Sequence, residues 1–177
     1  DVAAHYGDPL REQRLLVESG TGFVDLSNRD VITVSGQDRL RWLHSLLTQH
    51  LEALPTGPAG GTDALLLTPH GHVEHSMAVL DDGERTWLHT EPDCGPALAG
   101  FLDSMRFLLR VEVSEVSADY AIVWEPVAEP HPDYLSRLRP GDLGGRDLYL
   151  PRAELAGYLD RATGPPAGMW PYEALRI

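Results

Sequence analysis

The feature that most constrains the fold is an alternating β-branched segment that passes directly into a helical one. Val31–Ser35 alternates in the manner of a half-buried strand. From Asp38 to His50, three leucines recur at helical spacing on one stripe. A strand followed at once by an amphipathic helix predicts mixed α and β structure.

The next segments predict a hairpin and a further strand. Ala64–Thr68 and Val73–Leu80 flank a Pro-His-Gly turn, in which glycine supplies a positive φ. Thr86–Thr90 has strand character and follows an Asp-Asp-Gly turn. We therefore expect three consecutive antiparallel strands.

A long helix is predicted from Pro96 to about Arg110. Proline suits the first turn of a helix, and apolar residues down to Leu108 and Leu109 form one wide face. Strands are predicted after it, over 111–116 and 120–124.

The remainder of the chain predicts a second, smaller region. Residues 126–140 are rich in proline and predict a linker or long loop, followed by a strand over 147–150 and a helix over 152–162. We expect an α+β fold with mixed or antiparallel sheets and packed helices. Its domains are predicted to be 1–125 and an incomplete subdomain, 126–177, that shares the same core.

Composition narrows the possible partners. The net charge is −13, from 14 Lys+Arg against 27 Asp+Glu, which repels nucleic acid. No apolar run approaches the roughly 18 residues of a membrane span, and no signal peptide opens the chain. The single cysteine excludes an intrachain disulfide. These features predict a cytoplasmic protein that binds neither nucleic acid nor membrane.

The histidines do not predict a metal site. His72 and His75 would project from opposite sides of a strand, and His70 lies in the turn between the strands. His44 and His50 are single helical histidines without a matching partner. We expect no metal.

Common catalytic motifs are absent. No G-x-S-x-G elbow, phosphate-binding P-loop or G-x-G-x-x-G sequence occurs. Cys94 precedes a predicted helix, but acidic neighbours oppose formation of its thiolate. The glycines of 141–145 are typical of a turn.

The C-terminal residues allow two interpretations. Asp147, Trp170, Tyr172 and Arg176 could together hold a planar ligand that bears a carboxylate, since arginine grips carboxylates and aromatic rings stack. The same residues are also typical of a surface aspartate, packed aromatics and a solvated arginine. The residue types alone favour this second interpretation.

The order of motifs resembles the YgfZ-type folate-binding proteins, which belong to the superfamily of the glycine-cleavage aminomethyltransferase (GcvT, T-protein). The resemblance runs from about Gly22 to Ile177. It rests on five blocks in the family's order: GFVDLSNRDVITVSGQDRLRWLHSLLTQH, LLLTPHGHVEHSMAVL, FLDSMRFLLRVEVSEVS, GRDLYLP and EALRI.

This resemblance implies a GcvT-like folate-binding domain with tetrahydrofolate as ligand. In the implied site Asp147 receives the pterin, Arg176 attracts the glutamate tail and Trp170 forms a wall. The YgfZ branch further implies a role in assembly or repair of iron–sulfur cluster proteins, which would be the partners. That branch's K-G-C-x-x-G-Q-E motif does not occur in the chain. We expect it C-terminal to Ile177, in a part of the fold that is absent here.

One departure from the family bears on catalysis. His75 and Ser76 occupy the positions where the aminomethyltransferases have an Asp-Asp pair, of which one aspartate is catalytic. A conventional aminomethyltransferase is therefore not expected, and no catalytic residue is assigned. Two alternatives remain: an aminomethyltransferase in which another carboxylate, such as Glu74, has taken over, and a non-catalytic interaction module with a degraded folate pocket.

Overall fold

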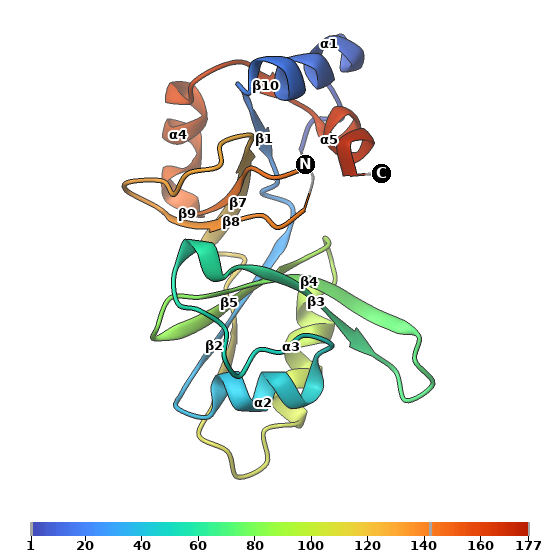
Figure 1. Cartoon of the computed structure of the whole chain (residues 1–177), viewed down its shortest axis with the longest axis vertical. Coiled ribbons are helices and arrows are strands. Elements are labelled where there is room, and N and C mark those ends of the chain that lie inside the picture. Colours follow the sequence, from blue (N-terminus) through green and yellow to red (C-terminus); the bar gives the residue numbers. More distant parts are fainter. Residues whose placement is uncertain (1, 142, 177) are drawn as a thin grey trace. The chain divides into compact units, whose positions relative to one another are not determined.

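The chain divides into two compact units, each built on a five-stranded sheet (Figure 1). The computed structural model describes residues 2–141 and 143–176, so Asp142 of the glycine-rich turn and Ile177 lie outside the described residues. Unit 2 is 29–117, and unit 1 combines 1–28 with 118–177. This division differs from the predicted boundary after residue 125, because the segment 1–28 belongs with the C-terminal part of the chain.

Unit 2 contains an antiparallel sheet with the strand order β3-β4-β5-β2-β6. The predicted hairpin and the three strands around it are confirmed. The strands of this sheet are β2 (Asp30–Ser35), β3 (Thr62–Leu67), β4 (Val73–Asp81), β5 (Arg85–Thr90) and β6 (Glu112–Glu115).

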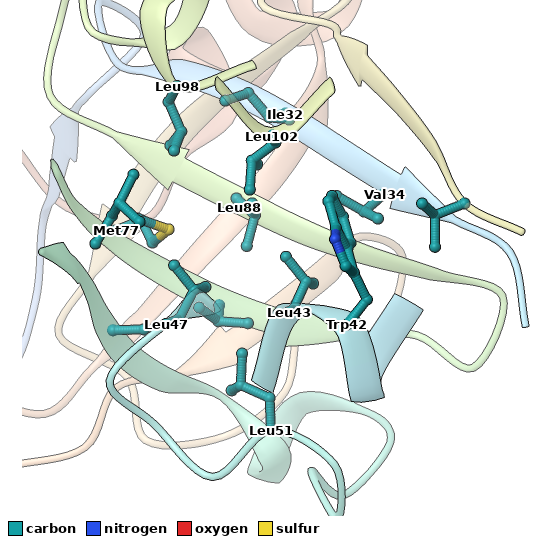
Figure 2. Packing of buried hydrophobic residues seen from close by; sticks show 14 residues of the cluster. Ile32, Val34, Trp42, Leu43, Leu47, Leu51, Met77, Leu88, Leu98 and Leu102 are labelled. Atoms are coloured by element: carbon teal, nitrogen blue, oxygen red, sulfur yellow. The ribbon is translucent and has the colours of Figure 1, made fainter. Parts of the chain in front are cut away.

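Two helices pack on this sheet and contribute to its core together with residues of the strands. They are α2 (Arg39–Leu46) and α3 (Gly95–Ser104); a short 3₁₀ turn, η2 (Pro58–Gly60), precedes β3. Leu43 of α2 and Leu98 and Leu102 of α3 are fully buried with Leu88 of β5 (Figure 2). Burying such leucines is the main favourable term in forming the unit, at about 1.5–3 kcal/mol each.

Helix α3 is shorter than predicted. It ends at Ser104, and Leu108 and Leu109, which were expected on its apolar face, are 100% and 44% exposed. Phe107 has a φ of 49°, in the left-handed region, which an α-helix cannot continue through. Because the apolar spacing continues to Leu109, the helix was predicted to extend beyond Ser104, where it ends.

Unit 1 contains a mixed sheet with the strand order β10-β1-β7-β9-β8, in which only the β1–β10 pair is parallel among the described strands. Strand β8 lies inside the segment predicted to be a linker. The strands are β1 (Phe23–Asp25), β7 (Tyr120–Glu125), β8 (Leu135–Leu138), β9 (Arg146–Pro151) and β10 (Pro166–Ala167).

The helices of unit 1 lie near both ends of the chain. The predicted helix over 152–162 forms as a 3₁₀ turn that continues into α4. The helices are α1 (Pro9–Arg14), the π-helix η1 (Leu15–Ser19), η3 (Arg152–Glu154), α4 (Leu155–Arg161) and α5 (Met169–Arg176). None of the helices in the described ranges is both long and apolar enough to cross a membrane.

The register of β7 and β9 gives the unit 1 sheet two different faces. Trp124 pairs with Asp147, and Glu125 pairs with Arg146. Directly paired residues share a face, and successive residues point to opposite faces. We call the side of Asp147 the Asp147 face and the side of Glu125 the Glu125 face.

The observed architecture confirms the predicted fold class. Both units combine sheets with packed helices, one sheet antiparallel and one mixed.

Candidate functional site

Asp147 lies at the centre of a buried ion pair on the Asp147 face. Its Oδ2 is 2.8 Å from Nη1 of Arg137, and both side chains are fully buried. The two residues are direct partners in the β8–β9 register, which is why their side chains meet. The carboxylate that the resemblance assigned to the pterin is therefore held by a neighbouring strand and is closed to solvent.

A second arginine links Asp147 to helix α5. Nε of Arg139 is 3.7 Å from Oδ2 of Asp147, and its Nη1 donates to the hydroxyl of Tyr172. The Cζ atoms of Arg139 and Arg176 lie 5.5 and 5.9 Å from the centre of the Tyr172 ring. At these distances a guanidinium is attracted to an aromatic face.

These contacts place two of the three predicted site residues in one array. We call Arg137, Arg139, Asp147, Tyr172 and Arg176 the arginine–tyrosine cluster. Arg176 also forms an ion pair with Glu173, at 2.8 Å, and its side chain is 36% exposed. Within the cluster, Asp147 is the buried end and Arg176 is the solvent-facing end.

Trp170, the third predicted residue, lies on the surface of helix α5. It is 60% exposed, and its ring centre is 5.1 Å from that of His5. Its backbone N–H donates to the carbonyl of Ala4, so the N-terminal segment fixes the start of α5. Trp170 is accessible to a ligand, but the contacts described above connect the cluster through Tyr172 and not through Trp170.

A hollow of about 340 Å³, lined mostly by residues with apolar side chains, adjoins the cluster. It is lined by Trp124, whose ring centre is 5.5 Å from that of Tyr172, and by Leu175, the neighbour of Arg176. Leu16 and Val17 of η1 form another part of its wall. The Asp147 face thus combines a buried charged interior with a small open hollow.

The Glu125 face carries a larger hollow, of about 460 Å³. At its base, Oε2 of Glu125 accepts from Nε of Arg146 at 2.8 Å, and Oε1 accepts from the hydroxyl of Tyr158. The size is within the range of small-molecule sites. None of Asp147, Trp170 and Arg176 lines this hollow.

Burial shifts two titrating groups beside this hollow. The pKa of Tyr158 is raised well above its usual value of 10, first by burial and then by the hydrogen bond to Glu125. The pKa of His131 is lowered from 6.5, mainly by burial and also by the positive charge of Arg146. Both groups are therefore neutral near pH 7.

The hairpin of unit 2 carries His75 and Ser76 at the two positions where the resemblance suggested a site. His75 is partly buried and pairs with Leu66 across the β3–β4 ladder, while Glu74 and Ser76 are exposed. Strand alternation points Glu74 and His75 to opposite faces. In the described ranges, no group of three or more His, Cys, Asp or Glu side chains could hold a metal ion.

Sequence reasoning missed Arg137 and Arg139. Both lie in or just after β8, within the proline-rich segment that was predicted to be a loop. Their spacing of two is the available signal, because alternate residues of a strand share a face. The segment L-S-R-L-R would have predicted two arginines beside β9 had it been taken as a strand.

Comparison with known proteins supports the fold alone. No protein-family model and no curated protein matches the chain. The glycine cleavage system aminomethyltransferase T from Bartonella henselae is similar in structure, with a TM-score of 0.70 and 17% identity. The similarity covers 89% of this chain and 50% of that one, so the chain spans about half the length of this relative.

A second similar structure is the heterotetrameric sarcosine oxidase from Corynebacterium sp. U-96 in complex with pyrrole 2-carboxylate. The TM-score is 0.49 at 13% identity, over 97% of this chain and 95% of that chain. A score at this level is too low to support an argument. The chain has an α+β fold shared with the Bartonella aminomethyltransferase.

Proposed function

We propose that the chain is a tetrahydrofolate-binding protein of the YgfZ type. The proposal rests on the sequence resemblance described above together with the fold it shares with an aminomethyltransferase. The single observation that carries it is the meeting of Arg139 and Arg176 at the ring of Tyr172, next to Asp147. These residues come from separate strands and a helix, and they bring two cations to one aromatic surface.

The residues present fit the anionic end of a folate better than its pterin. Arg176 is partly exposed and can donate to a carboxylate in a bidentate manner. The Asp147 side chain is fully buried, with its Oδ2 held by Arg137 at 2.8 Å, so a pterin could reach this carboxylate only if the surrounding side chains rearranged. In our proposal Arg176 therefore contacts the glutamate tail and Trp170 forms a wall of the site. Asp147 acts as a positioning residue that holds Arg139.

Titration of the chain with tetrahydrofolate under anaerobic conditions tests this assignment. We expect saturable binding, weakened in Arg176→Ala by about 1.5–3 kcal/mol, the cost of losing a charge-assisted hydrogen bond. Arg41→Ala is the matched control, because Arg41 is an exposed arginine of α2 in the other unit. Absence of saturable binding, or equal affinity in Arg176→Ala and wild type, would exclude the assigned site.

The cellular role in the proposal follows from the resemblance to the YgfZ branch. In it, the protein acts in the cytoplasm and supports assembly or repair of iron–sulfur cluster proteins, without nucleic-acid or membrane partners. Cells that lack the protein should then lose activity of iron–sulfur enzymes, and the wild-type gene should restore it. Restoration by Arg176→Ala to the same level would separate this role from folate binding.

Aminomethyl transfer is not part of the proposal. Glu74, the carboxylate that precedes His75 in the sequence, is exposed and points away from the face of His75. Formation of methylene-tetrahydrofolate from an aminomethylated carrier, abolished in Glu74→Gln, would overturn this part of the account.

A further inference from the structure

The hollow on the Glu125 face has a base in which the charges are already paired. Glu125 and Arg146 lie within a salt bridge, and the Tyr158 hydroxyl donates to the second oxygen of Glu125. Nη1 of Arg146 donates to the carbonyl of Glu129 at 2.8 Å. This base is neutral and fixed by its own contacts, so a ligand's charges would have to be recognised at the rim.

The rim carries one acid and one base without a partner of their own. Among the residues that the structure describes, the side chains of Asp133 and Arg161 have neither a salt bridge nor a hydrogen bond, although both line the hollow. The Arg161 guanidinium lies over Gly157, one turn earlier in α4, where a Cβ would be 3.1 Å from its Nη1. Because Asp133 and Arg161 do not form an ion pair with each other, they offer one negative and one positive contact to a bound ligand.

Both charges act on the same aromatic side chain. The Tyr134 hydroxyl donates to Glu154 at 2.8 Å, and this bond is the main reason that the pKa of Tyr134 is raised. Among the weaker influences, Arg161 lowers that pKa and Asp133 raises it. The two opposite charges therefore lie near Tyr134.

Aromatic rings form one wall of the hollow and small residues form another. The ring centres of His131 and Tyr158 lie 4.9 and 5.7 Å from that of Tyr134. Gly20 and Gly22 contribute to the lining without side chains. The Nδ1 atom of His131 accepts from the backbone N–H of Asp133 at 3.1 Å, which fixes the ring beside the rim. The rings of His131 and Tyr158 are inclined at 45° and 84° to that of Tyr134, so a flat group would stack on one ring and meet a neighbouring ring edge-on.

We infer that this hollow binds a small zwitterion with a planar apolar body, the chemistry of an aromatic amino acid. Arg161 receives the carboxylate, Asp133 receives the ammonium group, and the ring lies against Tyr134 and His131. The site is separate from the proposed folate site, since Glu125 and Asp147 are on opposite faces of the sheet. It does not depend on folate binding.

L-phenylalanine and two analogues, each of which lacks one of its two charges, test the inference. L-phenylalanine carries both charges, phenethylamine lacks the carboxylate, and 3-phenylpropionate lacks the ammonium group. We expect L-phenylalanine to bind the chain most tightly in calorimetric or ligand-observed NMR titrations. Each missing charge should weaken binding roughly fivefold, which corresponds to about 1 kcal/mol for a partly exposed ion pair.

Two variants assign the charges. Arg161→Ala should remove the preference for L-phenylalanine over phenethylamine and leave phenethylamine binding unchanged. Asp133→Asn should remove the preference over 3-phenylpropionate and leave 3-phenylpropionate binding unchanged. Arg41→Ala is the control and should change neither preference. Both rim residues are exposed and unpaired, so these substitutions should leave the fold intact.

Several results would overturn the inference. One is the absence of saturable L-phenylalanine binding to the wild-type chain. Another is equal affinity for all three probes, which would mean that neither charge is recognised. A third is a preference that survives in both variants. Loss of tetrahydrofolate binding in Arg176→Ala with retained L-phenylalanine binding would support two independent sites.

Discussion

Each face of the unit 1 sheet carries an arginine–carboxylate ion pair, but the two pairs differ in their surroundings. On the Asp147 face, Asp147 and Arg137 are completely buried, and the cluster reaches solvent only through Arg139 and Arg176. On the Glu125 face, an arginine–carboxylate pair forms the base of an open hollow. Asp147 and Arg146 are neighbours in sequence. The comparison shows that a one-residue step along a strand separates a fully buried ion pair from one that lines a hollow and is about one-tenth exposed.

The largest expected difference between the faces is in stability. Arg137→Ala leaves a buried carboxylate without a strong partner, and we expect the free energy of unfolding to fall by about 3–5 kcal/mol in urea denaturation. Arg146→Ala should cost less, about 1–3 kcal/mol, because water in the hollow can reach Glu125. An equal or larger loss in Arg146→Ala would contradict the contrast between the two faces.

The turn before β9 decides which residue points to which face. Gly144 and Gly145 both have a positive φ, of 58° and 77°. A Cβ at Gly145 would lie 2.4 Å from the carbonyl oxygen of Glu125, whereas a Cβ at Gly144 would meet open space. A slip of one residue here would exchange Arg146 and Asp147 between the faces.

A matched pair of variants tests the role of this turn. Gly144→Ala should cost about 1 kcal/mol through its backbone conformation alone. Gly145→Ala should cost at least about 1 kcal/mol more, because its Cβ also meets backbone. Equal melting temperatures for the two variants would show that the close approach at Gly145 does not fix the strand.

Alkaline pH should affect the Glu125 face through Tyr158. The folded-state pKa lies above the unfolded value of 10, so this group's stabilisation is complete below about pH 10 and is lost as pH rises further. Tyr158→Phe should lower stability by about 1 kcal/mol at neutral pH and reduce the loss above pH 10. The Tyr134 hydroxyl is more exposed, so Tyr134→Phe should change the dependence of stability on alkaline pH less. The prediction fails if Tyr158→Phe and wild type decline in parallel.

The smallest expected effect is that of acidic pH on stability, through His131. The pKa of His131 is lowered below 6.5 in the folded chain, so its contribution to stability is present above pH 6.5 and is lost as pH falls. His131→Gln should flatten the stability profile below pH 6.5, as measured by thermal denaturation. His72→Gln, at the exposed hairpin tip, is the control and should leave the profile unchanged.

The strands of unit 2 could be predicted because their signal is local. Alternation and turn residues between β3, β4 and β5 are visible within a few positions. The end of α3 could not be predicted, because Leu108 continues the apolar spacing although the backbone has already turned at Phe107. The spacing of apolar residues carries no information about the change of backbone direction at Phe107.

The candidate site was harder to predict because its pairing is not local. Arginine is rarely fully buried, and the burial of Arg137 depends on a β8–β9 register that the proline-rich sequence does not suggest. The resemblance to a folate-binding family singled out Asp147, Trp170 and Arg176. It carried no information about Arg139, which connects the first of these to Tyr172.

Mapping of tetrahydrofolate on the labelled chain by amide chemical shifts tests the central proposal most directly. We predict saturable shifts in α5 (Met169–Arg176) and at Arg139, with α4 (Leu155–Arg161) unchanged and the α5 shifts lost in Arg176→Ala. Shifts confined to α4 and the rim of the larger hollow, or no saturable shifts at all, would contradict the assignment of folate to the Asp147 face.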